Sequence, residues 1–167
     1  MLEKMQDVFA YFAMWDVFRT LTSTDNALWN YLKNRMAAWE LIKDEVTNSL
    51  FEAYVYAVLH DEKYMLLDGY PRTLEQMKTT MELLTEHKRE VLGVQFVIPD
   101  ELALERMRGR WRSDDTESAM QHRIDQFYAN TQPTIDWFAQ KHTLLTIDAT
   151  QSIQSIHAQV IEHISWS

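Results

Sequence analysis

The pattern of apolar and polar positions changes near residue 64. The first glycine is Gly69 and the first proline is Pro71, so the preceding stretch lacks the two strongest breakers of secondary structure. Apolar residues recur at helical spacing from about Leu2 to Leu21, which predicts a helix with one apolar stripe. A strand over Val8–Phe12 is the alternative, and it would leave only about ten residues for a crossover. The periodicity favours the helix.

Beyond this opening, segments of helical and strand character follow one another. Strands are expected over 64–67, 93–98 and 143–147, where short apolar runs occur. Helices are expected over 26–38, 43–60, 73–89, 100–109, 114–140 and 153–164, with a bend at Pro133 in the long one. Strands alternating with helices predict an α/β fold, with a parallel sheet between helices in three layers.

Composition narrows the class of protein. A length of 167 residues suits one domain, 1–167. No run of eighteen or so apolar residues occurs, so no membrane partner is expected. The formal net charge of −9 argues against binding to nucleic acid. Without cysteine the chain has neither disulfides nor thiolate metal sites, which fits the cytoplasm. The histidines show no metal-site spacing.

The hexapeptide Asp68-Gly69-Tyr70-Pro71-Arg72-Thr73 follows directly on a predicted buried strand. Ligands of open α/β sheets bind at the carboxyl ends of strands. Glycine permits close backbone approach, proline stiffens the turn, and arginine can fork onto a phosphate. The hexapeptide therefore indicates a phosphate site, and a purely structural strand-to-helix turn is the alternative.

A group of arginines is the second chemical signal. Arg106, Arg108, Arg110 and Arg112 lie close together in an otherwise acidic chain, and Arg123 follows. A solvated helix face would explain such a group. Guanidinium groups beside Asp114 and Asp115 would also suit the binding and orientation of phosphates during phosphoryl transfer.

These motifs together resemble the adenylate kinase family of nucleoside monophosphate kinases over about 21–164. The resemblance rests on several segments in the family's order: Leu66-Leu67-Asp68-Gly69-Tyr70-Pro71-Arg72-Thr73 with Gln76, Ile98-Pro99-Asp100-Glu101-Leu102, Arg112-Ser113-Asp114-Asp115 with Arg123, Thr131-Gln132-Pro133, and Ile147-Asp148-Ala149-Thr150-Gln151-Ser152-Ile153. The resemblance implies a P-loop-kinase-like fold that transfers a phosphoryl group from ATP to AMP.

The resemblance also implies roles for individual residues. The acceptor nucleotide AMP would be held by Thr24, Glu40, Leu41, Ile42, Gly69, Tyr70, Pro71, Arg72, Gln76, Arg112 and Arg123. The donor ATP would meet Arg106, Arg110 and Gln151, and the catalytic arginines would be Arg72, Arg106, Arg110, Arg112 and Arg123. Asp68 would contact magnesium, the cofactor expected with the nucleotide, through a bound water. Arg108 competes with Arg110 for one of these roles.

The first third of the chain departs from the family's pattern. The family's glycine-rich donor loop needs glycines and a lysine, whereas no glycine precedes Gly69 and Lys4 is the only lysine before Ser23. Trp29 stands near the position expected for a phosphate-binding arginine, and Trp39 replaces a glycine. The lid is reduced to Trp111. We therefore expect an aromatic helix over 1–22 in place of the loop, shortened acceptor helices over 23–60, and a conventional core with a vestigial lid over 61–167.

Three functions fit this degenerate N-terminal portion. The first is a nucleotide-binding relative with lost or strongly reduced phosphoryl transfer. The second is an active kinase whose donor phosphates are held in another way, for instance at a helix N-terminus near Trp15; an N-terminally shortened ordinary kinase is a variant of it. The third is a scaffold protein, because six tryptophans and seven tyrosines would suit a protein partner or a homodimer formed through the aromatic N-terminal helix.

Overall fold

The computed structural model describes residues 9–23, 27–37, 40–58, 64–109 and 116–163. The chain divides into two compact units, Met1–Arg89 and Glu90–Ser167, and each unit is considered by itself. The predicted α/β class with parallel strands is confirmed, because each unit contains one parallel pair of strands together with helices. The single domain over 1–167 stays a prediction.

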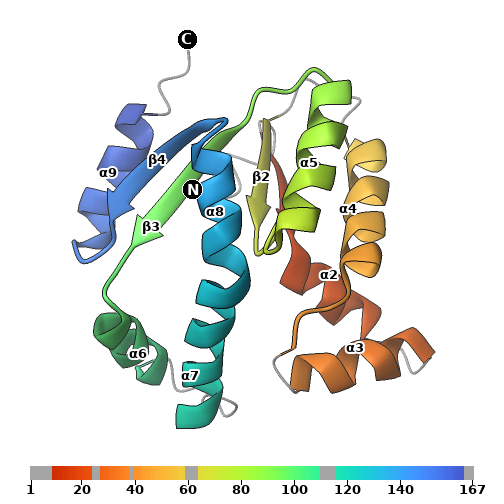
Figure 1. The fold of residues 1–167 in the computed structure, drawn as a ribbon, viewed down its shortest axis with the longest axis horizontal. Helices are drawn as coiled ribbons and strands as arrows, with labels where there is room; N and C mark the ends of the chain where they lie inside the picture. Colours follow the sequence, from red (N-terminus) through yellow and green to blue (C-terminus); the bar gives the residue numbers. More distant parts are fainter. Residues whose placement is uncertain (1–8, 24–26, 38–39, 59–63, 110–115, 164–167) are drawn as a thin grey trace. The chain divides into compact units, whose positions relative to one another are not determined.

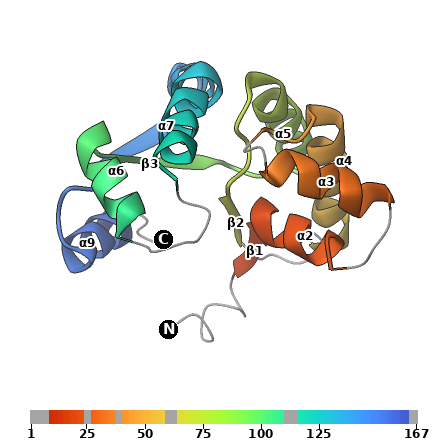
Figure 2. The same cartoon turned by 90° about the horizontal axis from the view of Figure 1, so that it is seen from below.

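The first unit is built on the strand pair β1 and β2. Its elements are β1 (Phe9–Ala13), α2 (Met14–Leu21), α3 (Ala27–Ala37), α4 (Asp44–Val58), β2 (Tyr64–Asp68) and α5 (Leu74–Glu86). The two strands are parallel, and their register sets Ala13 opposite Asp68. Helices α4 and α5 lie side by side on the same face of this pair (Figure 1, Figure 2).

The continuous helix predicted from about Leu2 to Leu21 is wrong over the described part of the opening. Residues 9–13 form a strand, close to the Val8–Phe12 alternative, and the helix is confined to α2. Pairing with β2 explains the difference, since it places Phe12 in the core and leaves Tyr11 52% exposed on the opposite face. Tertiary pairing has overridden a local helical period. The aromatic N-terminal helix expected to carry a protein partner is therefore much shorter than predicted.

Aromatic packing joins β1 to α4 and to the turn after β2. The Phe12 ring lies 5.3 Å from the ring of Phe51 and 6.1 Å from that of Tyr70, both edge-on. Tyr54 donates a hydrogen bond from its hydroxyl to the carbonyl oxygen of Tyr11 over 3.0 Å. The buried core around these rings comprises Phe12, Met14, Phe18, Leu32, Ile42, Phe51, Val55, Tyr70 and Leu83.

The second unit is built on the strand pair β3 and β4. Its elements are β3 (Leu92–Val97), α6 (Asp100–Arg108), α7 (Glu117–Gln126), a π-helical segment (Phe127–Thr131), α8 (Gln132–Ala139), β4 (Thr143–Asp148) and α9 (Ile153–His163). The strands are parallel, with Val97 opposite Asp148. Helices α8 and α9 lie on opposite faces of the pair, so this unit has three layers (Figure 1, Figure 2).

The other helices and strands predicted from the sequence are confirmed within the described residues. The long helix expected over 114–140 is resolved into α7, the π-helical segment and α8. The wider π turn ends at Thr131, two residues before Pro133, whose nitrogen cannot donate a backbone hydrogen bond, and it takes the place of a sharp break. Among the described helices, none is both long enough and apolar enough to cross a membrane.

Gly93 provides a test of packing in the second unit. A Cβ atom at this position would lie 2.6 Å from Cε1 of the buried Phe138 and 2.8 Å from Cδ1 of Leu144. We expect Gly93→Ala to lower the free energy of unfolding by about 1–3 kcal/mol, because the ring of Phe138 has no room to move. Chemical denaturation of the whole chain measures the change.

The matched control is Gly109→Ala. Its Cβ would lie 3.6 Å from the carbonyl oxygen of Glu105 and 3.7 Å from that of Arg106, which are ordinary contact distances, and the backbone there is already helical. We expect a change within about 0.5 kcal/mol. Equal losses in the two variants would contradict the packing argument.

Candidate active site

A cavity in the first unit opens beside the carboxyl end of β2. It draws its walls from α2, from the end of α3 and the segment after it, from α4, and from the turn between β2 and α5. The lining residues are Met14, Trp15, Phe18, Met36, Glu40, Leu41, Ile42, Thr47, Gly69, Tyr70, Arg72 and Gln76. Most of them are apolar, and the polar ones are concentrated at the turn after β2 and at α4. The chemistry of this wall suits a flat organic ring with a polar end, but the cavity holds only about 50 Å³ in the ligand-free chain and must widen to admit one.

The turn after β2 has a defined backbone that brings an arginine to the cavity. Gly69 has φ = +70°, a left-handed conformation that glycine adopts without strain. Arg72 folds back over it, and its Nε donates to the carbonyl oxygen of Gly69 over 3.0 Å. The Arg72 side chain as a whole is exposed, but its guanidinium is desolvated by the surrounding protein, which lowers the pKa of Arg72 against the opposing effect of Asp68.

The side chain of Tyr70, the residue after Gly69, is buried in the core of the first unit. Its hydroxyl donates to Oδ1 of Asn48 over 2.8 Å. Burial raises the pKa of Tyr70 to about 12, so the phenol stays neutral under ordinary conditions. Tyr70 therefore anchors the turn and brings no charge to the cavity.

Gln76 and Asp44 form a polar network beside this turn. Gln76 is 3% exposed, and its Nε2 donates to Oδ1 of Asp44 over 2.8 Å and to Oγ1 of Thr47 over 3.1 Å. Its Oε1 accepts from the backbone N–H of Arg72 over 2.7 Å. Thr73, the N-cap of α5, donates from Oγ1 to the second oxygen of Asp44 over 3.0 Å. One carboxylate thus links the N-termini of α4 and α5.

Asp68 lies at the end of β2, where its carboxylate is exposed. The hydroxyl of Tyr11 donates to its Oδ2 over 2.9 Å, and this hydrogen bond is the main reason that the pKa of Tyr11 is raised. The described residues contain no cluster of three or more side chains suited to hold a metal ion.

The junction between β1 and α2 has no loop. The strand ends at Ala13 and the helix begins at Met14, with Ala13 in extended conformation as the N-cap. The hydroxyls that follow are used inside the helix: Thr20 donates to the carbonyl oxygen of Asp16, and Thr22 to that of Arg19. Trp15 is the second residue of α2, so the helix N-terminus expected near Trp15 is present.

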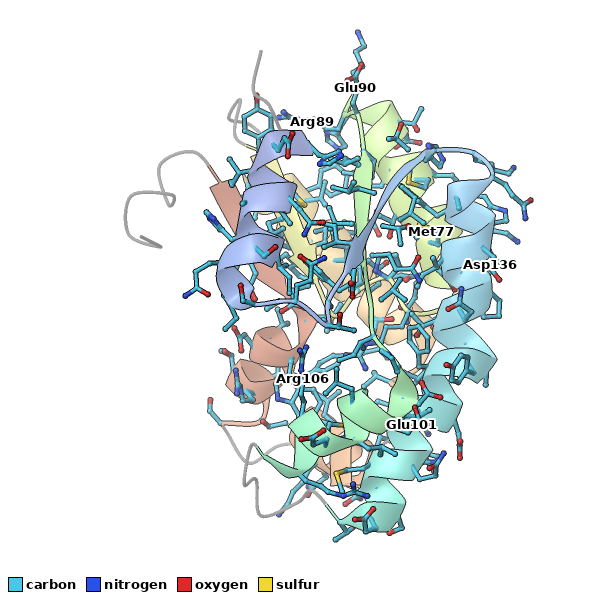
Figure 3. The ribbon with its side chains drawn as sticks, turned by 90° about the vertical axis from the view of Figure 1, so that its left-hand side faces the viewer. Met77, Arg89, Glu90, Glu101, Arg106 and Asp136 are labelled. Carbon is cyan, nitrogen blue, oxygen red and sulfur yellow. The ribbon has the colours of Figure 1, made fainter. Side chains whose placement is uncertain are left out.

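The predicted donor-side residues of the described chain lie in the second unit. Arg106 extends from α6 and its Nη1 donates to the carbonyl oxygen of Ala149 over 2.7 Å (Figure 3). Arg123 is half-buried on α7, with Nη1 4.0 Å from Sδ of Met107. Gln151 donates to Asp148 over 3.4 Å and accepts from the hydroxyl of Ser155 over 2.5 Å.

Arg108 forms an ion pair with Glu117. Its Nε and Nη2 donate to the two carboxylate oxygens of Glu117 over 2.8 and 2.9 Å. This bidentate hydrogen bonding raises the pKa of Arg108 and lowers that of Glu117. Arg110, the other candidate for the predicted donor contact, lies outside the described residues.

The structure brings together much of the predicted acceptor set. Among the residues predicted to hold AMP, those that line the cavity are Glu40, Leu41, Ile42, Gly69, Tyr70, Arg72 and Gln76. Pro71 lies in the same turn but is not part of the lining. Thr24 and Arg112 fall outside the described residues, as does Arg110 of the donor set. Arg106, Arg123 and Gln151 belong to the second unit.

Sequence reasoning missed the apolar half of the cavity and the carboxylate behind it. The lining residues not predicted are Met14, Trp15, Phe18, Met36 and Thr47. Thr73 and Gln76 at a spacing of three form the N-terminal signature of a helix, which could have indicated a structural role for Gln76. No local signal connects Asp44 to them, because it precedes Gln76 by more than thirty positions.

Comparison with known proteins agrees with this arrangement. The family model for adenylate kinase matches residues 3–143. The chain belongs to the adenylate kinase family. It is similar to the adenylate kinase of Oenococcus oeni, with 30% identity over 90% of this chain and 81% of the relative. It is also similar to the adenylate kinases of Rhodococcus erythropolis (30% identity; 87% of this chain, 80% of the relative) and Prochlorococcus marinus (34%; 84% and 76%).

Membership in the adenylate kinase family confirms the resemblance drawn from the motifs. It places the chain among proteins whose chemistry is that of nucleoside monophosphate kinases and whose substrates are nucleotides. The cavity of the first unit, which contains much of the motif, is accordingly the candidate acceptor site.

Replacing Gln76 tests the polar network beside the cavity. Gln76→Leu removes both donors to Asp44 and Thr47 and leaves the Arg72 N–H without its acceptor. We expect the free energy of unfolding to fall by about 1–3 kcal/mol, because buried polar groups lose their partners. Thermal and urea unfolding of the full chain measure the loss.

Gln121→Leu is the matched control. Gln121 makes a similar bond, from Nε2 to Oδ1 of Asp125 over 3.0 Å, but it is exposed to solvent. Water replaces the lost partner there, so the expected change is within about 0.5 kcal/mol. If Gln121→Leu lowered the free energy of unfolding as much as Gln76→Leu does, burial would not explain the stabilising effect of the Gln76 network.

Proposed function

We propose that this chain is an adenylate-kinase-like protein that binds AMP in the cavity of its first unit and transfers phosphoryl groups poorly or not at all. The observation that carries the proposal is the shared location of the predicted acceptor residues around one cavity at the carboxyl end of β2. Thr24, Pro71, Arg112 and Arg123 belong to the proposed acceptor set on the strength of the family pattern.

The chemistry of the cavity supports a mononucleotide as its ligand. The guanidinium of Arg72 lies at the cavity beside Gly69, where it can meet a phosphate. The apolar side chains of Met14, Phe18 and Ile42 offer a surface for a nucleobase. A polar end beside an apolar wall matches the two ends of AMP.

The donor side supports the second half of the proposal. A loop that wraps donor phosphates needs inward-pointing N–H groups in unusual backbone conformations, for which glycine is suited. Here Ala13 is followed at once by helix, and no glycine precedes Gly69. Because positioning and electrostatics supply nearly all of phosphoryl-transfer catalysis, their loss on the donor side would greatly slow the reaction.

Magnesium fits these residues only as part of a nucleotide complex. Asp68 offers one exposed carboxylate at the end of β2, suited to hold a water of a hydrated ion, as magnesium usually keeps several waters. We assign to Asp68 this water-mediated contact.

Arg106, Arg110 and Gln151 are the proposed donor contacts. The lack of cysteine supports a cytoplasmic location.

Titration calorimetry of the full chain tests the acceptor site. We expect AMP to bind, and Arg72→Ala to weaken the binding by about 10- to 150-fold, the usual range for losing a hydrogen bond to a charged group. Arg19→Ala is the matched control, since Arg19 is exposed on α2 and pairs with Asp16 away from the cavity lining. Undetectable AMP binding by the wild-type chain would overturn the proposal.

A coupled assay with ATP, AMP and magnesium tests the donor side. We expect a turnover lower than that of the Oenococcus oeni enzyme by a factor of at least ~1,000, a loss typical when a transition-state contact set is removed. Tight binding of the bisubstrate analogue Ap5A, together with turnover near that of the control enzyme, would instead establish an active kinase with an unusual donor site.

A further inference from the structure

The side chain of Asp68 lies on the face of the strand pair that is turned away from α4 and α5. Along β2, Met65 and Leu67 pack against the buried core, and Asp68 alternates with them. Tyr11 of β1 lies on the same outer face, since its neighbour Phe12 is buried in the core. Both Asp68 and Tyr11 are exposed, and neither belongs to the lining of the cavity. A contact between these two side chains is therefore made outside the candidate acceptor site.

The hydroxyl of Tyr11 holds one oxygen of the Asp68 carboxylate. It donates to Oδ2 over 2.9 Å, and this bond is the main reason that the pKa of Tyr11 is raised, so the phenol remains a neutral donor. The register sets Asp68 two positions beyond the direct partner of Tyr11, so the phenol reaches diagonally across the strand pair. The carbonyl oxygen of Tyr11 accepts from the hydroxyl of Tyr54 over 3.0 Å. The donor that Asp68 meets is therefore itself fixed to α4.

Arg72 is a second group to which the Asp68 carboxylate is attracted. Nε of Arg72 donates to the carbonyl oxygen of Gly69, the residue after Asp68, over 3.0 Å. Burial lowers the pKa of Arg72, and the negative charge of Asp68 opposes this fall. The guanidinium is therefore already within electrostatic range of the carboxylate, while the Arg72 side chain lines the cavity. Any movement of the carboxylate toward Arg72 would strengthen this attraction.

A carboxylate that turned toward Arg72 would compete with a phosphate for the same guanidinium. Arginine donates through a planar fork of N–H groups, and both carboxylates and phosphates fit this fork. The Tyr11 hydroxyl opposes such a turn in two ways. It fixes Oδ2 of Asp68 on the outer face of the strands, and its partial positive charge offsets part of the charge on the carboxylate. The guanidinium thus stays more open to a phosphate than it would be without the phenol.

We propose that Tyr11 is a positioning residue for the phosphate contact of the cavity: its hydroxyl holds Asp68 away from Arg72 and so leaves the guanidinium to the phosphate of a mononucleotide. This inference rests on the proposed function, because it concerns the arginine that would bind that phosphate. Tyr11 acts through Asp68 and does not touch the ligand. The held carboxylate keeps its other oxygen, Oδ1, for the water-mediated magnesium contact proposed above.

Calorimetric titration of the full chain with AMP and with adenosine, both without magnesium, tests the inference. Tyr11→Phe removes only the hydroxyl and keeps the ring on the strand. We expect it to weaken AMP binding by about 3- to 10-fold, as for the loss of one ordinary hydrogen bond, and to leave adenosine binding within about 2-fold. Adenosine lacks the phosphate, so a general disturbance of the cavity would weaken the binding of both ligands alike.

A second substitution shows whether Tyr11 acts through Asp68. Asp68→Asn removes the competing charge, and we expect it to raise the affinity for AMP in the absence of magnesium. When Asp68→Asn is already present, Tyr11→Phe should change AMP binding by less than about 2-fold, because no carboxylate is left to release. This double-mutant cycle needs AMP alone, so it remains decisive where adenosine binds too weakly to be measured.

Tyr56→Phe is the matched control. Tyr56 is 55% exposed on α4, and its ring lies 5.6 Å from that of His87. His87 follows the C-terminal end of α5, whereas Arg72 precedes the N-terminal end of this helix. The loss of the Tyr56 hydroxyl should therefore change neither the affinity for AMP nor that for adenosine. Circular dichroism and urea unfolding establish that each variant is folded.

The outcomes distinguish the inference from the function on which it rests. A loss of affinity in Tyr11→Phe that is confined to AMP and disappears beside Asp68→Asn would establish the role of Tyr11. Equal losses for AMP and adenosine, no loss for either, or a loss for AMP that persists beside Asp68→Asn would overturn this role while leaving AMP binding intact. Undetectable AMP binding by the wild-type chain would overturn the proposed function, and this inference with it.

Discussion

The parallel pairing of β1 with β2 is the constraint on which the candidate site depends. It sets Ala13 opposite Asp68, so that the start of α2 and the turn at Gly69 emerge at the same edge of the strand pair. The Phe12 side chain, one residue earlier, packs against Phe51 and holds the pair to α4. Parts of the chain distant in sequence therefore meet at one cavity, with an apolar wall from α2 and a polar one from the turn.

Under the proposed function, the two sides of phosphoryl transfer are unequally represented in this chain. The proposed acceptor side has a glycine turn, an arginine and an apolar wall around one cavity. On the donor side, the strand passes directly into a helix whose hydroxyls bond to its own backbone. Binding a mononucleotide needs only the first of these arrangements, whereas transferring a phosphoryl group needs both.

Much of the fold could be predicted because its elements are locally encoded. Short apolar runs gave β2, β3 and β4, and helical periodicity with suitable ends gave most of the helices. The strand β1 could not be recognised, since its apolar residues also fit a helix and only pairing with β2 decides between them. The segment Asp68–Thr73 allowed the turn and the role of Arg72 to be predicted. The hydrogen bond from Gln76 to Asp44 could not be predicted, because the two residues are distant in sequence and no local pattern connects them.

The polar network also has a kinetic consequence. Asp44, Thr73 and Gln76 hold the turn that carries Arg72 in the ligand-free chain. A ligand that meets an already ordered turn does not have to pay the entropy of ordering it. Association is then limited by the widening of the cavity, which holds only about 50 Å³ in the ligand-free chain, and not by the ordering of the turn.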